Sequence, residues 1–264
     1  MILGAKLASG TGADVFAWGE GQVVKLFKPD NIEGMAQYEA WVTATAFAAG
    51  APAPEVLGQV DVQGRPGIVL PRYDGPTLAS LMHEGQLSWS EGGAIMAGLY
   101  HRLHAGAYRT SLLTFRAWMG ICFGRLTAAG VSEDVLRKAQ SVAESLPDAG
   151  PLCHGDLHAS NIIMTADGPQ AVDWISALNA NPMLDVARCH LTLTMLVPDA
   201  RDRQSSRRAD AAFMSQYARL AGTTDDALAE AMAPYMCVMA AARMIESGCG
   251  DDEQRRLAQF VLCY

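Results

Sequence analysis

Extended, alternating patterns of apolar and polar residues fill the first part of the chain, and glycine-bearing segments separate them. Two short connections, around Gly10 and Gly19, lie between runs of high strand propensity, which predicts a meander of antiparallel strands. Between the third and fourth of these runs, the apolar residues at positions 35–49 have helical spacing, with Met35, Tyr38 and Val42 on one face. The predicted strands are 2–8, 15–18, 22–27, 56–62 and 67–70.

Helical patterns take over after the break at Asp74-Gly75-Pro76. Ser88 and Glu91 fit a capping box, in which each side chain bonds a free backbone N–H at the start of a helix. The predicted helices are 88–105, 133–146 (capped by Ser132), 183–196, 208–220 and 225–246. The pattern therefore predicts an α+β protein, with a small β-rich lobe and one helix at 1–70, a hinge at 71–76 and a larger, mostly helical lobe at 77–264.

Composition and charge narrow the class of protein. Half of the 264 residues are hydrophobic, which supplies a sizeable core. The net charge of −8 argues against nucleic acid as the main partner, because binding to backbone phosphates needs a basic surface. The longest uncharged apolar stretch, 231–242, contains Pro234 and is too short to span a bilayer. The six cysteines are scattered without a C-x-x-C pair, which is typical of reduced thiols, so we expect a soluble, cytoplasmic protein with no membrane partner.

Polar side chains gather at the ends of two short apolar runs, 162–164 and 170–172. These runs flank a turn and predict a hairpin, with Asn161 and Asp173 placed almost symmetrically about it. Cross-strand neighbours have Cβ atoms about 5 Å apart. Two oxygen-bearing side chains at that separation can share a Mg²⁺ ion, which prefers one or two such ligands plus phosphate oxygens. Asp156 leads into the same end of the hairpin from the preceding loop, so three polar side chains are expected to converge.

The stretch His154-Gly155-Asp156, followed by Asn161 and then by Asp173-Trp174, resembles the signature of aminoglycoside phosphotransferases and their choline-kinase-like relatives. It is also similar to the catalytic and metal-binding segments of protein kinases, with H-G-D in place of H-R-D and D-W in place of D-F-G. The resemblance implies a two-lobed, protein-kinase-like fold. It also implies that Asp156 orients or deprotonates the acceptor hydroxyl, while Asn161 and Asp173 hold Mg²⁺ on the nucleotide phosphates. Asp185 resembles the aspartate that supports the catalytic loop in that family.

The resemblance extends to looser motifs in the small lobe. The segment Ser9-Gly10-Thr11 resembles a nucleotide loop that covers phosphates, and it also fits an ordinary hairpin turn. Lys25 resembles the lysine on the third strand that binds the α- and β-phosphates. Glu39 lies close to the apolar stripe of the predicted helix, where a carboxylate is costly unless it is paired. Lys25 is therefore its predicted partner, with the solvent margin of the stripe as the alternative. The backbone near Leu70 and Arg72 is expected to contact the nucleotide at the hinge.

The short spacing between Asp173 and Asp185 disfavours a protein kinase, because it leaves no room for a long activation segment and no A-P-E element follows. The expected reaction transfers phosphate from ATP, or alternatively GTP, to a small hydroxylated acceptor with Mg²⁺ as cofactor. An aminoglycoside-type antibiotic is the preferred, cationic acceptor, which would make the protein a determinant of antibiotic resistance. Two alternatives stay open. One is a metabolic kinase of choline-like, amino-alcohol or sugar substrates, and the other is a non-catalytic nucleotide-binding regulatory module.

Carboxylates late in the chain provide a further comparison. In aminoglycoside-modifying members of the family, acidic residues of this region bind the ammonium groups of the acceptor. The motif does not align residue by residue here, and nearby arginines dilute the cluster, so no substrate residues are assigned. The carboxylates in question are Glu246, Asp251, Asp252 and Glu253.

Overall fold

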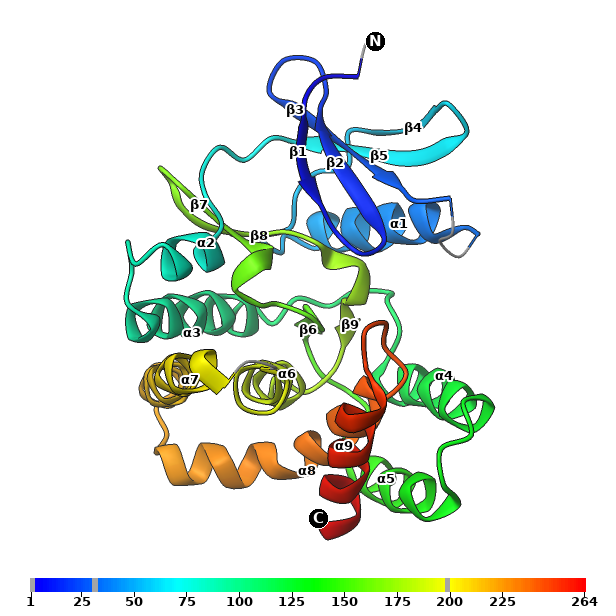
Figure 1. The fold of residues 1–264 in the computed structure, drawn as a ribbon, viewed down its shortest axis with the longest axis vertical. Coiled ribbons are helices and arrows are strands. Elements are labelled where there is room, and N and C mark those ends of the chain that lie inside the picture. Colours follow the sequence, from blue (N-terminus) through cyan, green and yellow to red (C-terminus); the bar gives the residue numbers. More distant parts are fainter. Residues whose placement is uncertain (1–2, 30–32, 198–199) are drawn as a thin grey trace.

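The computed structural model describes residues 3–29, 33–197 and 200–264, and it shows a two-lobed α+β fold (Figure 1). The small lobe is built on an antiparallel sheet with the strand order β1-β2-β3-β5-β4. The predicted meander is therefore confirmed, although the first strand begins only at Lys6, and Ile2 lies outside the described residues. The strands are β1 (Lys6–Ser9), β2 (Ala13–Ala17), β3 (Gln22–Phe27), β4 (Gly58–Val62) and β5 (Arg65–Pro71).

Helix α1 (Met35–Ala48) packs on this sheet through Ala36 and Ala40, which share a core cluster with Phe27 and Ile68. The face predicted for this helix is partly wrong, because Tyr38 is 37% exposed. The helix also contacts the short 3₁₀ turn η2 (Trp174–Ser176) of the large lobe. Two neighbours on different sides therefore decide which residues are buried, and a single apolar stripe does not describe them.

The segment after β5 joins the lobes and is pinned to the predicted hairpin. That hairpin is present as β7 (Ile162–Thr165) and β8 (Gly168–Ala171). The N–H of Met164 donates to the carbonyl of Pro76 at 2.9 Å. Gly75 has φ 150°, and a Cβ there would lie 2.0 Å from the Met164 carbonyl oxygen. Only glycine permits this approach, so the connection is held directly beside the hairpin.

The large lobe is a set of helices around one extensive apolar core, with α3 lying along α7 and α6 against α8 (Figure 1). Two small antiparallel pairs, β7–β8 and β6 (Leu152–Cys153) with β9 (Leu178–Asn179), lie between these helices and the sheet of the small lobe (Figure 1). Within the described ranges, no helix has the length and apolar character needed to cross a membrane. The helices are α2 (Leu78–His83), α3 (Trp89–Ala105), α4 (Phe115–Ala128), α5 (Glu133–Ser145), α6 (Met183–Thr194), α7 (Ala200–Leu220), α8 (Asp225–Arg243) and α9 (Asp251–Cys263).

Several helix boundaries differ from the predicted ones. The capping box of Ser88 and Glu91 is present, but Ser132 at the start of α5 makes no side-chain cap hydrogen bond. Helix α7 begins at Ala200 and not at 208; the prediction missed its first turns because they are polar and carry no apolar stripe. Helix α8 ends at Arg243 and not at 246, because the bond from the Glu246 N–H to the Arg243 carbonyl has the tighter 3₁₀ pattern. Helices α2, α4 and α9 were not predicted individually.

Candidate active site

Lys25 brings two carboxylates from different lobes together. It lies on β3, between β2 and β5, and its side chain is only 15% exposed. Its Nζ donates to both oxygens of Glu39 at 2.7 and 2.9 Å and to Oδ1 of Asp173 at 2.9 Å. Burial alone would lower the pKa of Lys25, but Glu39 and Asp173 outweigh that effect and raise it. Lys25 therefore stays protonated, and it links the sheet to the end of the β7–β8 hairpin.

Glu39 is the buried half of this ion pair. It lies on α1 with 2% of its surface exposed. Burial raises the pKa of Glu39 to about 7, and the opposing effect of Lys25 is smaller. The predicted pair is thus present, and the alternative of a solvent-margin position is wrong. Without Lys25, this carboxyl group would have no cationic partner in the protein interior, and burial would raise its pKa further.

Asn161 and Asp173 finish side by side at one end of the hairpin. Ile162 pairs with Ala171, and the N–H of Val172 donates to the carbonyl of Asn161 at 3.0 Å. Asp173 has φ 67° and ψ 63°, a left-handed conformation that aspartate tolerates better than most residues. Burial would raise the pKa of Asp173, but Lys25 outweighs it and the pKa is lowered.

The donor set at this end of the hairpin fits a hard divalent cation. The Asn161 amide donates from Nδ2 to the carbonyl of Asp156 at 3.0 Å, which leaves its Oδ1 as a potential ligand. Asp173 uses Oδ1 for Lys25, so its second carboxylate oxygen remains as a ligand. Amide and carboxylate oxygens of this kind suit Mg²⁺ together with phosphate oxygens.

The loop before Asp156 is held by hydrogen bonds from its backbone to the carboxylate of Asp185. Asp185 is fully buried on α6 and accepts the N–H groups of His154 at 2.8 Å and Gly155 at 2.7 Å, together with Nε2 of His104 at 3.1 Å. Burial would raise the pKa of Asp185, but the hydrogen bond from His104 and the other partners lower it. Gly155 has φ 81°, and a Cβ there would lie 2.2 Å from the Ser176 carbonyl oxygen. The backbone therefore turns sharply just before Asp156.

The side chain of Asp156 is oriented by a residue that was not predicted. Arg188, also on α6, donates from Nε at 3.1 Å and from Nη2 at 2.9 Å to Oδ1 of Asp156. The second carboxylate oxygen of Asp156, Oδ2, lies 3.9 Å from Nε2 of His158, which is beyond hydrogen-bond distance. A sequence signal did exist, because Arg188 is a charged residue inside the otherwise apolar run that follows Asp185.

The residues predicted for the nucleotide loop and the hinge make their contacts within the small lobe and the segment that follows it. Ser9 is exposed and its hydroxyl donates to Asp14 at 2.7 Å, while the carbonyl of Gly10 accepts from Lys28 at 2.7 Å. Thr11 is exposed. Of the two hinge residues, Leu70 packs against the core cluster of the small lobe, and the exposed Arg72 pairs with Asp74 at 2.7 Å. Their part in nucleotide binding stays a prediction.

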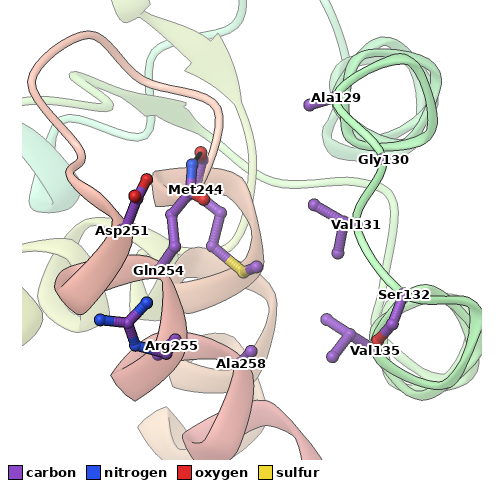
Figure 2. Close-up of a pocket in the computed structure, with 10 residues that line it drawn as sticks. All are labelled: Ala129, Gly130, Val131, Ser132, Val135, Met244, Asp251, Gln254, Arg255 and Ala258. Carbon is purple, nitrogen blue, oxygen red and sulfur yellow. Dashed lines mark hydrogen bonds between the residues drawn. The ribbon is translucent and has the colours of Figure 1, made fainter.

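A hollow with a volume of about 340 Å³ lies away from these residues, between the α4–α5 turn and α9 (Figure 2). Val131 and Ser132 line one side, and Gln254 and Arg255 line the other. It includes none of the residues that converge on Lys25 and Asp156. The chemistry of this protein is therefore expected at the junction of the lobes and not in this hollow.

A two-lobed fold with this lysine, carboxylate pair and H-G-D loop defines a kinase-like phosphotransferase. Residues 4–229 match the phosphotransferase enzyme family (APH), and the chain belongs to this family. A comparison with curated proteins found no match.

Solved structures share the fold at low sequence identity. The chain is similar to a thermostable mutant of aminoglycoside phosphotransferase APH(4)-Ia in ternary complex with AMP-PNP and hygromycin B, with a TM-score of 0.66, 18% identity and coverage of 98% of this chain and 92% of that one. For a choline/ethanolamine kinase family protein from Mesorhizobium loti, the TM-score is 0.62 at 19% identity, over 100% and 86% of the chains. For the streptomycin–ATP–APH(2")-IIa ternary complex, it is 0.58 at 15% identity, over 100% and 92%. These likenesses show a common kinase-like fold.

Proposed function

We propose that this protein transfers the γ-phosphate of ATP to a hydroxyl group of a small molecule, with an aminoglycoside-type antibiotic as the preferred acceptor class. The observation that carries the proposal is Lys25, which bridges Glu39 on α1 and Asp173 at the end of the hairpin. In this arrangement the ammonium group of Lys25 lies beside the potential metal ligands at the end of the hairpin, Asn161 and Asp173. We expect the phosphates of a nucleotide to lie there. Solved structures with the same fold that hold AMP-PNP, ATP or ADP support nucleotide binding by this chain.

Each residue has a distinct part in the proposed reaction. Lys25 binds the α- and β-phosphates, and Asn161 and Asp173 hold Mg²⁺. When bound, this cation neutralises charge on the phosphate oxygens. Asp156 accepts the proton of the acceptor hydroxyl on Oδ2, the oxygen that Arg188 leaves free. The acceptor oxygen forms a bond to the γ-phosphorus as the bond to the bridging oxygen breaks, and ADP leaves. We place the reaction in the cytoplasm, where ATP is available and cysteines such as the six free ones of this chain stay reduced.

A specific observation favours the second candidate, a metabolic kinase of choline-like, amino-alcohol or sugar acceptors. Three of the four late carboxylates already bond arginines: Glu246 to Arg188 and Arg243, Glu253 to Arg243, and Asp252 to Arg255. Carboxylates paired in this way have less attraction left for a polycationic acceptor. The pairing therefore suits an acceptor of low positive charge. The regulatory module is the weakest candidate, because every residue assigned to the chemistry is intact.

The experiment is a panel of acceptors with γ-labelled ATP, including hygromycin B, streptomycin, choline and simple sugars. Asp156→Asn keeps the shape of the side chain but removes its capacity to take a proton, so turnover should fall by about 10²–10⁴-fold. ATP affinity, measured by titration calorimetry, should change little because Lys25, Asn161 and Asp173 remain. Asp167→Asn, in the exposed turn of the hairpin, is the matched control and should behave as wild type. Wild-type turnover in Asp156→Asn would refute the assignment.

A further inference from the structure

Arg188 is a charged residue in a buried part of a helix, where apolar residues are usual. It lies on α6 between Ala187 and Cys189, both buried, and only 8% of its own surface is exposed. Its guanidinium group donates two hydrogen bonds to Asp156 and two to Glu246, at 2.8 Å from Nη1 and 2.8 Å from Nη2. Burial would lower its pKa, but the two carboxylates outweigh this and raise it, so Arg188 stays charged.

We propose that Arg188 is a positioning residue that holds the Asp156 carboxylate in one orientation, and that Glu246 holds Arg188 in place. The inference rests on the proposed phosphotransferase function, in which Asp156 takes the proton of the acceptor hydroxyl. Both bonds from Arg188 go to Oδ1 of Asp156, so the rotation of the carboxylate is restricted while Oδ2 stays available. A group held in its reactive orientation spares the reaction the cost of ordering it.

The charge of Arg188 would otherwise work against this task, because a lone guanidinium group would compete with the acceptor for Asp156. Glu246 counters that charge with a bidentate bond to Arg188. It also accepts a bond from Arg243 at 2.9 Å, and Arg243 bonds Glu253 on α9 at 2.6 Å. Three carboxylates and two guanidinium groups thus form one connected chain from Asp156 to α9. Glu246 is therefore assigned to the support of the catalytic loop and not to the acceptor.

The first test compares Arg188→Gln and Arg188→Lys with wild type. Transfer is measured to hygromycin B and choline, and to water as ATP hydrolysis, alongside ATP affinity and thermal unfolding. A misplaced catalytic group costs about 10²-fold in rate, so kcat of Arg188→Gln should fall by about that factor, with ATP affinity within twofold of wild type. Arg188→Lys keeps the charge but cannot form the fork, so its kcat should also fall while its thermal stability stays closer to wild type. Arg219→Gln, on the exposed side of α7, is the control.

The second test asks whether Arg188 acts through Asp156. In an Asp156→Asn background, Arg188→Gln should lower turnover no further, because residues that act as one unit are not additive. If the two losses multiply, Arg188 acts elsewhere and the proposal is overturned. A kcat of Arg188→Gln within twofold of wild type, or above it, would also overturn it. If Arg188→Gln does not fold, Glu246→Gln takes its place in both comparisons, with a smaller fall in kcat expected.

A crystal structure of Arg188→Gln separates this inference from the proposed function. We expect the Asp156 carboxylate to leave its wild-type orientation or to occupy more than one. An unchanged, fully ordered Asp156 would overturn the inference even if kcat had fallen. Absence of transfer to every acceptor by the wild-type protein would instead count against the proposed function, and the orientation of Asp156 in the variant would still decide the role of Arg188.

Discussion

Asp185→Asn tests how the catalytic loop is held, because the two side chains differ only in replacing one carboxylate oxygen with an NH₂ group. In the native protein, His154 N–H points to one oxygen of Asp185 and Gly155 N–H points to the other. An amide has a single oxygen, so one of these N–H groups must face another donor. The site is fully buried, and water cannot reach it to relieve the conflict.

The magnitude follows from these contacts. Loss of one hydrogen bond to a charged acceptor is worth about 1.5–3 kcal/mol, and a buried donor left unpaired costs about 1–3 kcal/mol more. A combined loss of roughly 2.5–6 kcal/mol would remove a large part of the typical stability of a folded protein, about 5–15 kcal/mol. The weakened bond from His104 adds to the loss in the same direction.

The assay is urea unfolding followed by tryptophan fluorescence, since Trp174 is fully buried with its ring 4.6 Å from that of His154. Asp134→Asn is the control: its carboxylate is 74% exposed and pairs with Arg137 at the surface, so its loss should stay below about 1 kcal/mol. A loss of less than about 1 kcal/mol for Asp185→Asn would refute the conclusion that Asp185 stabilises the loop through its hydrogen bonds to the His154 and Gly155 N–H groups.

The same variant has an expected pH dependence. The pKa of Asp185 is lower in the folded protein than its ordinary value. Its contribution to stability is therefore fully present above the unfolded value, about 3.9, and is lost as the pH falls toward the folded value. Asp185→Asn should lose less of its remaining stability than wild type over that acidic range.

Two further predictions concern the ion-paired centre. Lys25→Met should weaken ATP binding at least tenfold and destabilise the fold by leaving Glu39 unpaired, and adding Glu39→Gln should restore stability but not ATP affinity. Lys138→Met on α5 is the control, and an unchanged ATP titration for Lys25→Met would contradict the role of Lys25 in phosphate binding. Asp173→Asn, which keeps a residue suited to the left-handed backbone, should raise the Mg²⁺ concentration needed for half-maximal turnover about tenfold or more, and an identical magnesium titration would remove Asp173 from the metal site.

Local patterns predicted much of this protein. The hairpin at 162–171 follows from two short apolar runs around a turn, and its symmetry already brings Asn161 and Asp173 to one end. Lys25 and Glu39 could be paired because a carboxylate near an apolar stripe needs a cation, and the third strand supplies one. These inferences succeed because they depend on residues close in sequence or on the energetic cost of a buried charge.

Other features could not be read from the pattern. The exposed face of Tyr38 results from α1 packing between the sheet and η2, and sequence periodicity does not show how many neighbours a helix has. Helix α9 begins within the acidic run at 251–253, which the charge pattern alone makes indistinguishable from a solvated surface segment. The pattern also did not show that Glu253 in this run pairs with Arg243, which belongs to the preceding helix.

The sequence by itself determined the two-lobed α+β plan and the group of residues around Asp156 that the chemistry requires, because periodicity and short-range spacing act over a few residues. Only the tertiary structure decided how Asp156 is oriented. Arg188 and Glu246 are separated from it by 32 and 90 positions along the chain, and α6 and the end of α8 must pack together before their charges can meet. The chain contains many carboxylates, and the packing of these elements decides that Asp156 and Glu246 are the two that lie within hydrogen-bond distance of Arg188.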